Sequence, residues 1–397
     1  MTITFISNYI NHHQIPFSDA LYALLGNDYH FIQTQPMEEE RLAMGWSRDG
    51  EELPYVLLLS QQEEECRRLI LESDVLLAGW SGREDLVQER MLSGKMTVRI
   101  SERIYREGRF KAISPRGLLH KYKEHIRFRN SKAYLLCAGA YVASDFALIR
   151  AYPGKMYRFG YFPETRHYLP GELEEKKTET DRIEIVWAAR FIPLKHPEYM
   201  LQLAKNLKER PEGDFHIHMV GGGELEEKMK ELARTYQIEE RITFYGFQSP
   251  AKVREIMEKC HIQIFTSNHL EGWGAVVNEG MNSGCVPVGN VQAGAVPYLI
   301  RHGYNGMVYP DDDYGKMEEA VRYLMTHPKE RRDMGRHAYE TIVQKWNAEE
   351  AAKRLIAMIE GWQKKEAVVY EDGPLSPAPV IAPGRMYASM MKEAKRK

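Results

Sequence analysis

Short apolar runs alternate with amphipathic stretches over most of the chain. In the first part the apolar runs lie at 2–7, 29–35, 55–60, 74–80, 95–101 and 133–139. In the second part they lie at 183–189, 215–221, 242–246, 262–267 and 285–289. Apolar runs separated by helical patterns predict βαβ units whose parallel strands are covered on both faces. We therefore expect an α/β protein with two doubly wound domains.

The alternation is interrupted once, at 163–182, where prolines, a glycine and many charges replace the apolar pattern. This composition is typical of a linker. It divides the chain into a first domain at 1–162 and a second at 183–345. A helical stretch at 346–365 is long enough to return to the first domain. We expect little packed structure in the proline-rich tail at 366–397.

Composition narrows the class of protein. The 397 residues carry a net charge of −2 and are 43% hydrophobic, so nothing in the bulk charge indicates a nucleic-acid partner. No apolar run reaches the ~18 residues that a membrane span needs, and the first residues do not resemble a signal peptide. The four cysteines form no CxxC pair, which favours a reducing, cytoplasmic setting without a zinc site.

Two glutamates flank a glycine-containing helix start in the segment EGWGAVVNE, at Glu271 and Glu279. Gly274, Ala275 and Val276 lie where a first helical turn would present backbone N–H groups to an anion. Glu279 is five residues beyond Gly274, or about 7.5 Å along a helix. That length matches the distance from a β-phosphate to a ribose, so Glu279 is expected to accept hydrogen bonds from ribose hydroxyls and Glu271 to contact a sugar.

The segment EGWGAVVNEGMNSGCVPVG resembles the signature of the GT-B family 4 glycosyltransferases. VWAARFIPLKHPEYML, HMVGGGELEEKMKELA, ITFYGF and HGYNGMVYP match in the same order. The resemblance is specific over about 183–345 and weak over the first domain. It implies a GT-B fold: two Rossmann-like domains facing a central cleft, with a C-terminal helix returning to the first domain.

The resemblance also assigns roles to Arg190 and Lys195, which follow the run at 183–189. In the family an arginine and a lysine in this loop grip the donor's diphosphate. Fixed cations stabilise the charge that builds on this leaving group, without a metal ion. The family usually has glycine after the lysine, whereas this chain has His196 followed by Pro197.

Two further segments of the second domain are assigned by the resemblance to the nucleotide end of the cleft. Gly222 and Gly223 directly follow the run at 215–221, where glycine permits either close approach to a ligand or a tight turn. They do not fit the G-x-G-x-x-G pattern of NAD sites. Phe247 follows the run at 242–246, near the family's nucleobase position. The alternative for Phe247 is a place in the core.

In the first domain, candidate residues follow two of the apolar runs. The loop after the first run holds a polar set in place of the family's usual glycines: Asn11, His12, His13 and Gln14. The histidines are expected either to face the acceptor or to cap the next helix. Glu102 follows the run at 95–101, near a position where many relatives have a histidine. It is either a carboxylate that orients the acceptor or accepts its proton, or a solvent-facing residue.

Two other features have simpler interpretations. Asp311–Asp313 precede a helical pattern, so helix capping is favoured over metal binding. The segment 116–129 combines an apolar stripe of Leu118, Leu119, Tyr122 and Ile126 with many basic residues. Such a helix usually buries its stripe in the domain, and peripheral membrane contact is the alternative.

These features predict a retaining glycosyltransferase that uses a UDP- or GDP-sugar and no cofactor or metal. The acceptor is expected to be a glycan or a lipid-linked glycan, in polysaccharide or surface-glycan synthesis. The resemblance implies front-face attack, since no pair of carboxylates is arranged as in glycosidases. The alternatives are a nucleotide-sugar epimerase of the same fold and a non-catalytic nucleotide-sugar binding protein.

Overall fold

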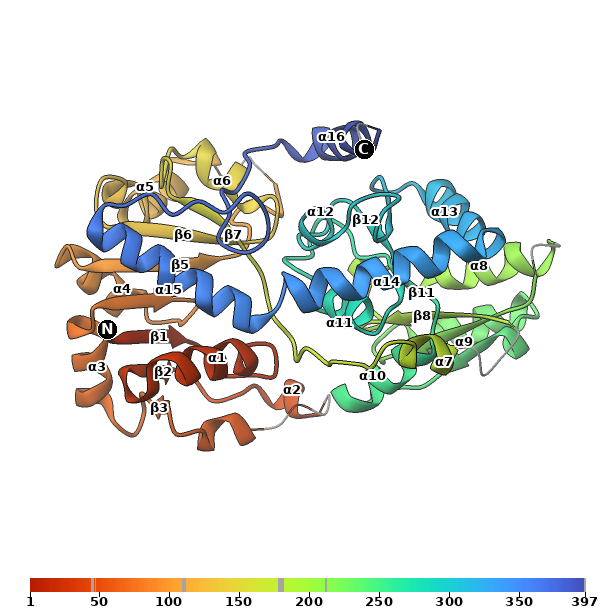
Figure 1. Ribbon diagram of the computed structural model, residues 1–397, viewed down its shortest axis with the longest axis horizontal. Helices are drawn as coiled ribbons and strands as arrows, with labels where there is room; N and C mark the ends of the chain where they lie inside the picture. The colour runs from red at the N-terminus through yellow and green to blue at the C-terminus, as the bar shows by residue number, and fades with distance from the viewer. Residues whose placement is uncertain (44–45, 47, 109–111, 178–181, 211–212, 396–397) are drawn as a thin grey trace. The chain divides into compact units, whose positions relative to one another are not determined.

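The computed structural model describes residues 1–43, 46, 48–108, 112–177, 182–210 and 213–395. The chain forms two compact units (Figure 1). Unit 1 comprises Met1–Glu164 and Asn347–Ala382, and unit 2 comprises Thr165–Trp346 and Pro383–Lys397. The first change of unit, at residue 164, lies within the expected linker.

Unit 1 is built on a seven-stranded parallel sheet with the order β3-β2-β1-β4-β5-β6-β7. Its strands are β1 Ile3–Ser7, β2 Tyr29–Gln33, β3 Val56–Leu58, β4 Val75–Ala78, β5 Met96–Ser101, β6 Ala133–Ala138 and β7 Met156–Phe159. Strands β1 and β4 are buried along their whole length, as expected for strands covered on both faces. The strand order reverses between β1 and β4, where doubly wound sheets form their ligand crevices.

The helices of unit 1 are α1 Ile15–Leu25, α2 Glu39–Ala43, α3 Glu63–Glu72, α4 Glu84–Leu92, α5 Pro115–Glu124, α6 Val142–Leu148 and α15 Ala348–Lys364. Helix α15 begins at Asn347, whose side chain accepts a hydrogen bond from the Glu350 backbone N–H (2.8 Å). It lies against α1 (Figure 1). The last long helical stretch of the sequence therefore packs on the first domain.

Unit 2 repeats the architecture with six parallel strands in the order β10-β9-β8-β11-β12-β13. They are β8 Ile183–Ala188, β9 Phe215–Val220, β10 Ile242–Phe244, β11 Ile262–Phe265, β12 Val286–Asn290 and β13 Met307–Tyr309. The helices are α7 Glu172–Lys177, α8 Glu198–Lys208, α9 Glu226–Thr235, α10 Pro250–Lys259, α11 Val276–Asn282, α12 Val296–Leu299, α13 Tyr314–Thr326, α14 Pro328–Gln344 and α16 Pro383–Ala394. Both sheets therefore confirm the predicted α/β class.

Two segments are more ordered than the sequence predicted. The expectation of little packed structure in the tail is wrong for residues near Leu375, which is fully buried. There the tail pairs with β7, and Arg158 N–H donates to the Ser376 carbonyl oxygen (2.8 Å). Residues 165–177 of the expected linker pack on unit 2 and end in α7; residues 178–181 lie outside the described residues. Both segments lack an apolar period, and both make hydrogen bonds to residues distant in sequence.

Candidate functional site

The two loops that hold the predicted catalytic residues of unit 2 follow neighbouring strands, β8 and β11. Lys195 ends a single 3₁₀ turn after β8, and Glu271 lies in the loop after β11. The Lys195 ammonium and the Glu271 carboxylate form a direct ion pair, with both side chains mostly buried. Arg190 lies two residues beyond the end of β8, on the same loop as Lys195. The strand order reverses between β8 and β11, so the site lies at the switch point of this sheet.

Hydrogen bonds join the two loops. The Thr266 hydroxyl donates to the Lys195 carbonyl oxygen and accepts from the buried Trp187 indole N–H (2.8 Å). Asn268 N–H donates to the carbonyl oxygen of Leu194 (3.1 Å). The backbone on either side of the Lys195–Glu271 pair is therefore held in place, which is what a preorganised site requires.

His196 occupies a backbone conformation that glycine favours. Its φ and ψ are 48° and 55°, in the left-handed region, at the end of the turn that contains Lys195. The left-handed conformation is the one that glycine adopts most easily, which fits the glycine that the family usually has at this position. A hydrogen bond from the ring to Glu198 (2.8 Å) stabilises the residue, and it raises the pKa of His196.

Helix α11 begins later than predicted. It runs from Val276, with Ala275 as N-cap, so Gly274 and Ala275 do not form its first turn. Gly274 has φ of 96°, and a Cβ there would lie 2.4 Å from the Phe265 ring, so both backbone conformation and packing require glycine. The helix has only seven residues, which weakens the argument that its dipole binds an anion.

Glu279 lies on α11 and is desolvated. Burial raises the pKa of its carboxyl group to about 7, while the nearby charges of Arg254 and Arg166 act in the opposite direction. Arg254 is buried; its guanidinium donates to the Ser283 hydroxyl (3.1 Å) and to the Asn282 side-chain oxygen, at the end of α11. Sequence reasoning missed Arg254, because a lone arginine in a helical pattern gives no signal.

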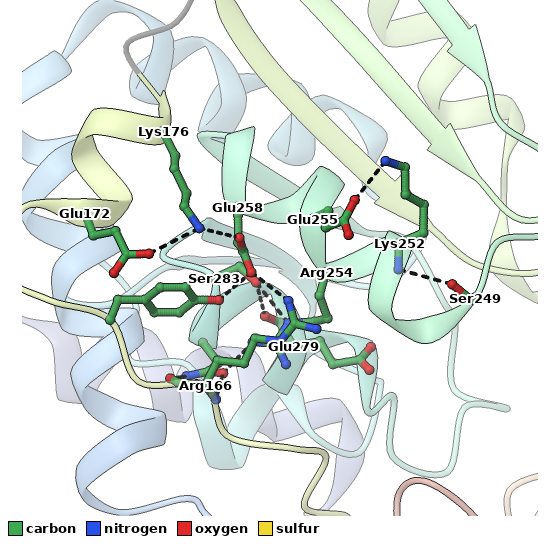
Figure 2. A network of polar contacts seen from close by, with 12 residues as sticks. Arg166, Glu172, Lys176, Ser249, Lys252, Arg254, Glu255, Glu258, Glu279 and Ser283 are labelled. Atoms are coloured by element: carbon green, nitrogen blue, oxygen red, sulfur yellow. Dashed lines mark hydrogen bonds and ion pairs between the residues drawn. The ribbon is translucent and has the colours of Figure 1, made fainter.

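A network centred on Glu258 fixes the start of unit 2 to the same region (Figure 2). Three groups donate to its carboxylate: Arg166 Nη1 (2.8 Å), Tyr168 Oη (2.6 Å) and Lys176 Nζ (2.8 Å). Burial alone would raise the pKa of Glu258, but these hydrogen bonds outweigh it and lower the pKa to about 2. The charged residues of the expected linker thus hold Arg166 beside α11.

The glycine turn after β9 is explained first by packing. A Cβ on Gly222 would lie 2.8 Å from the Phe247 ring, and one on Gly223 would lie 2.8 Å from the Phe191 carbonyl oxygen. Phe247 is not in the core, since 46% of it is exposed. An exposed aromatic ring above a glycine turn, at the carboxyl ends of β9 and β10, is suited to contact with a nucleobase.

Unit 1 contains a cavity of about 780 Å³ at the carboxyl ends of β1, β4 and β5. Asn11, His13, Gln14 and Glu102 all line it, and His12 lies beside it. Glu102 is not a purely solvent-facing residue: it accepts hydrogen bonds from the Tyr161 hydroxyl (2.7 Å) and from Arg106 (3.3 Å). The sequence did not indicate Trp46 or Trp80, which also line the cavity.

The two histidines of unit 1 do not cap the next helix. Gln14 is the N-cap residue of α1, without a side-chain cap bond. The His12 and His13 rings pack edge-on against Trp46 (4.5 and 5.8 Å between ring centroids). Burial, aided by the charge of Arg41, lowers the pKa of His12 to about 4, and burial also lowers that of His13. Both rings are therefore neutral near pH 7.

The acidic run at 311–313 caps a helix, as predicted. The Asp313 carboxylate accepts from Lys316 N–H (2.9 Å) at the start of α13. Asp311 accepts from the Asn290 side chain (2.8 Å). Within the described residues, no group of three or more His, Cys, Asp or Glu side chains could hold a metal ion. No helix in that part of the chain is long and apolar enough to cross a membrane.

Two doubly wound parallel sheets, with a late helix packed on the first, define the GT-B architecture. Solved structures share it: the Anabaena Alr3699/HepE complex with UDP has a TM-score of 0.68 over 91% of this chain and 100% of that chain, at 13% identity. An apo form of the lipopolysaccharide outer core galactosyltransferase WaaB has a TM-score of 0.66 over the same shares, also at 13% identity.

Residues 172–341, which lie within unit 2, match the family model described as glycosyl transferases group 1. N-acetyl-alpha-D-glucosaminyl L-malate synthase of Bacillus anthracis is 25% identical over 194 residues, 47% of this chain and 49% of that protein. The uncharacterized glycosyltransferase YqgM of Bacillus subtilis is 25% identical over 166 residues, 41% of this chain and 45% of that protein. The chain thus spans about half the length of these curated relatives. These matches do not favour the alternative of a nucleotide-sugar epimerase.

Proposed function

We propose that the protein transfers a sugar from a nucleoside-diphosphate sugar to an acceptor hydroxyl, with retention at the anomeric carbon. The observation that carries this proposal is the meeting of Lys195 and Glu271 at the switch point of unit 2. A nucleoside-diphosphate sugar contains a diphosphate and a sugar side by side. It therefore requires a cation that binds the diphosphate and, next to it, a carboxylate that accepts from the sugar hydroxyls.

In the proposed reaction the bond between the donor's anomeric carbon and the β-phosphate oxygen breaks, and the diphosphate leaves with the electron pair. The acceptor oxygen bonds to the anomeric carbon on the same face, and its proton passes to the departing phosphate oxygen. Arg190 and Lys195 stabilise the charge on the diphosphate, and Glu271 orients the sugar. Lys195 exchanges its contact with Glu271 for one with the diphosphate.

We propose a UDP-sugar as donor, with a GDP-sugar as the alternative. Alr3699/HepE has been solved with UDP-glucose, at 13% identity and a TM-score of 0.65, and a relative in Mycobacterium tuberculosis is named as a GDP-mannose-dependent mannosyltransferase. Glu279 would accept hydrogen bonds from the ribose, and the exposed Phe247 would contact the base. The acceptor, a glycan of a polysaccharide or surface-glycan pathway in the cytoplasm, would occupy the cavity of unit 1, with Glu102 orienting its hydroxyl.

A donor screen tests the proposal. UDP-, GDP- and ADP-sugars should differ in thermal stabilisation of the full chain, and a donor at ~100 Kd adds about 2.7 kcal/mol. Glu279→Ala should reduce that stabilisation, and Lys195→Ala should reduce it less. If no nucleotide sugar stabilises the wild-type protein, or if Glu279→Ala responds like wild type, the proposed donor site is wrong. Conversion of the donor to an epimer without an acceptor would instead support the epimerase.

A further inference from the structure

Unit 2 begins with a charged segment, residues 165–177, that contacts the C-terminal ends of α10 and α11; we call it the linker segment. Its last residue, Lys177, donates to the carbonyl oxygens of Glu258 (3.2 Å) near the end of α10 and Ser283 (3.0 Å) at the end of α11. The last carbonyl groups of a helix lack partners within the helix and carry partial negative charge, so a cation stabilises them. The linker segment therefore holds the ends of these two helices together.

Arg166 of the linker segment is fixed to both helices. Its backbone N–H donates to the Asn282 side-chain oxygen (2.8 Å), and its carbonyl oxygen accepts from the Asn282 side-chain nitrogen (3.0 Å). Its guanidinium donates to the Glu258 carboxylate (2.8 Å), which also accepts from Tyr168 and Lys176 (Figure 2). Asn282 is the last residue of α11, so α11 holds the backbone of Arg166 while α10 holds its side chain.

These contacts place Arg166 beside the Glu279 carboxylate. Glu279 precedes Asn282 by three residues, so the two side chains lie on the same face of α11. Figure 2 shows Glu279 in one cluster with Arg166 and Arg254. Burial disfavours the charged form of Glu279, whereas these two cations favour it. The ionised state of Glu279 therefore depends on side chains that belong to α10 and to the linker segment.

Glu258 acts on this cluster in two opposite ways. Its negative charge disfavours a second negative charge nearby, whereas its hydrogen bond keeps the Arg166 guanidinium in place. Helix α14 also packs on α11, but its buried Arg331 donates to the carbonyl oxygen of Leu324 in α13 (2.7 Å). The two effects of Glu258 predict opposite changes at Glu279 when the Glu258 charge is removed, so its role can be tested.

We propose that Arg166 and Glu258 are positioning residues for donor binding: Glu258 holds Arg166 in place, and the charge of Arg166 keeps Glu279 in the ionised form that accepts hydrogen bonds from the donor ribose. This inference rests on the proposed function, because it takes Glu279 as the group that binds the ribose. It gives the segment at which the chain enters unit 2 a part in donor binding, since Arg166 is the second residue of that unit.

Two measurements on the full chain test the proposal. NMR of the protein with isotope-labelled glutamate follows the pKa of Glu279 without any ligand, and Glu279→Gln identifies its signal. Calorimetry with UDP-glucose follows donor affinity across pH. Arg166→Met should raise the pKa of Glu279, so the affinity at neutral pH should fall about 3- to 5-fold. The affinity should return to the wild-type value at pH ~9, where Glu279 is ionised in both proteins, whereas a loosened structure would bind more weakly at every pH.

Glu258→Gln tests whether Glu258 positions Arg166. If Glu258 acted only through its own charge, this substitution would lower the pKa of Glu279. If it holds Arg166, the substitution should raise that pKa, as Arg166→Met does. Added to Arg166→Met, Glu258→Gln should cause no further rise, because the charge that it positions is already absent. Arg166→Lys keeps the charge and the backbone contacts, and it should retain most of the wild-type pH profile.

Glu255→Gln is the matched control, because Glu255 is exposed on the same helix and pairs with Lys252 (2.8 Å; Figure 2). It should leave the pKa of Glu279 and the affinity for UDP-glucose as in wild type. An unchanged pKa of Glu279 in Arg166→Met, or a lowered one in Glu258→Gln, would overturn the inference and leave the proposed function standing. If the pKa rises in both variants but the affinity for UDP-glucose does not follow it, Glu279 does not bind the ribose, and the proposed role of Glu279 is wrong together with the inference.

Discussion

The two units have the same architecture but differ in what fixes their proposed sites. In unit 2, a short loop after β8 and another after β11 place Lys195 against Glu271, and hydrogen bonds from Asn268 N–H and the Thr266 hydroxyl join the loops. In unit 1, long side chains and aromatic rings surround a cavity of about 780 Å³. A nucleoside diphosphate presents the same chemical groups whatever the acceptor, so its site can be fixed by the backbone, whereas a site lined by side chains is easier to alter by substitution.

The largest expected effect concerns Lys195. If it stabilises the departing diphosphate, its contact strengthens as the glycosidic bond breaks, so Lys195→Ala should lower kcat by about 10²–10³-fold with a smaller change in donor KM. Arg190→Lys should also be impaired, because an ammonium cannot reproduce the guanidinium fork. Steady-state kinetics measure both. Lys208→Ala on α8 is the matched control and should behave as wild type. A raised KM with an intact kcat would mean that Lys195 only tethers the donor.

The next prediction concerns the pH dependence of donor binding. Glu279 has a pKa raised to about 7, so it protonates as the pH falls through that value. The ionised form can accept two ribose hydrogen bonds, so affinity for a UDP-sugar should fall on acidification, about 10-fold or more by pH ~6 if only that form binds. The diphosphate of a UDP-sugar keeps its charge over this pH range, so the change in affinity reports the titration of Glu279 and not that of the ligand.

Arg254 should set the midpoint of that profile. Arg254→Met removes a charge that lowers the pKa of Glu279, so the profile should move to higher pH, and affinity at neutral pH should fall about 10-fold. Arg254→Lys keeps the charge and should restore part of the shift. Glu279→Gln should bind more weakly with no titration near pH 7. Calorimetry across pH measures all four proteins; an unchanged profile in Arg254→Met would remove Arg254 from this role.

In unit 1, Glu102→Gln should change the acceptor side alone. The amide keeps one oxygen that can accept from the Tyr161 hydroxyl, but it loses the negative charge and the second oxygen, which is proposed to contact the acceptor hydroxyl. We expect transfer to slow by about 10- to 100-fold, because a poorly oriented acceptor hydroxyl reacts more slowly, while donor affinity stays the same. If Glu102→Gln weakens donor binding as much as Glu279→Gln does, the proposed division into a donor unit and an acceptor unit is wrong.

The smallest expected effect is that of metal removal. The fixed positive charges of Arg190 and Lys195 are proposed to stabilise the diphosphate in place of a divalent ion. Dialysis against a chelator should therefore leave turnover unchanged. Turnover abolished by the chelator and restored by Mn²⁺ would contradict the metal-free mechanism.

The hydrophobic periodicity and the motifs of the sequence predicted much of this architecture. The elements and residues that they did not predict were missed for physical reasons. Strands β7 and β13 were not predicted: β7 is only partly buried and β13 has three residues, so neither shows a full apolar run. The Lys195–Glu271 pair could be anticipated, because both residues follow adjacent strands. The role of Arg254 could not be anticipated, because it depends on contacts with α11, which is distant from Arg254 in the sequence. The prediction that the stripe at 116–129 is buried is wrong for Leu118, Leu119 and Tyr122, which are exposed, whereas Ile126 packs on the core of unit 1. Apolar periodicity alone does not distinguish a buried face of a helix from an exposed one.

Hydrogen exchange of the full chain, with and without a UDP-sugar, tests the central claim most directly. If unit 2 is the donor domain, the ligand should slow exchange in the loops at 189–196, 221–224 and 266–279 of unit 2. The unit 1 loops at 8–14 and 79–82 should change less. Protection confined to the unit 1 loops, with no change in those of unit 2, would contradict the account.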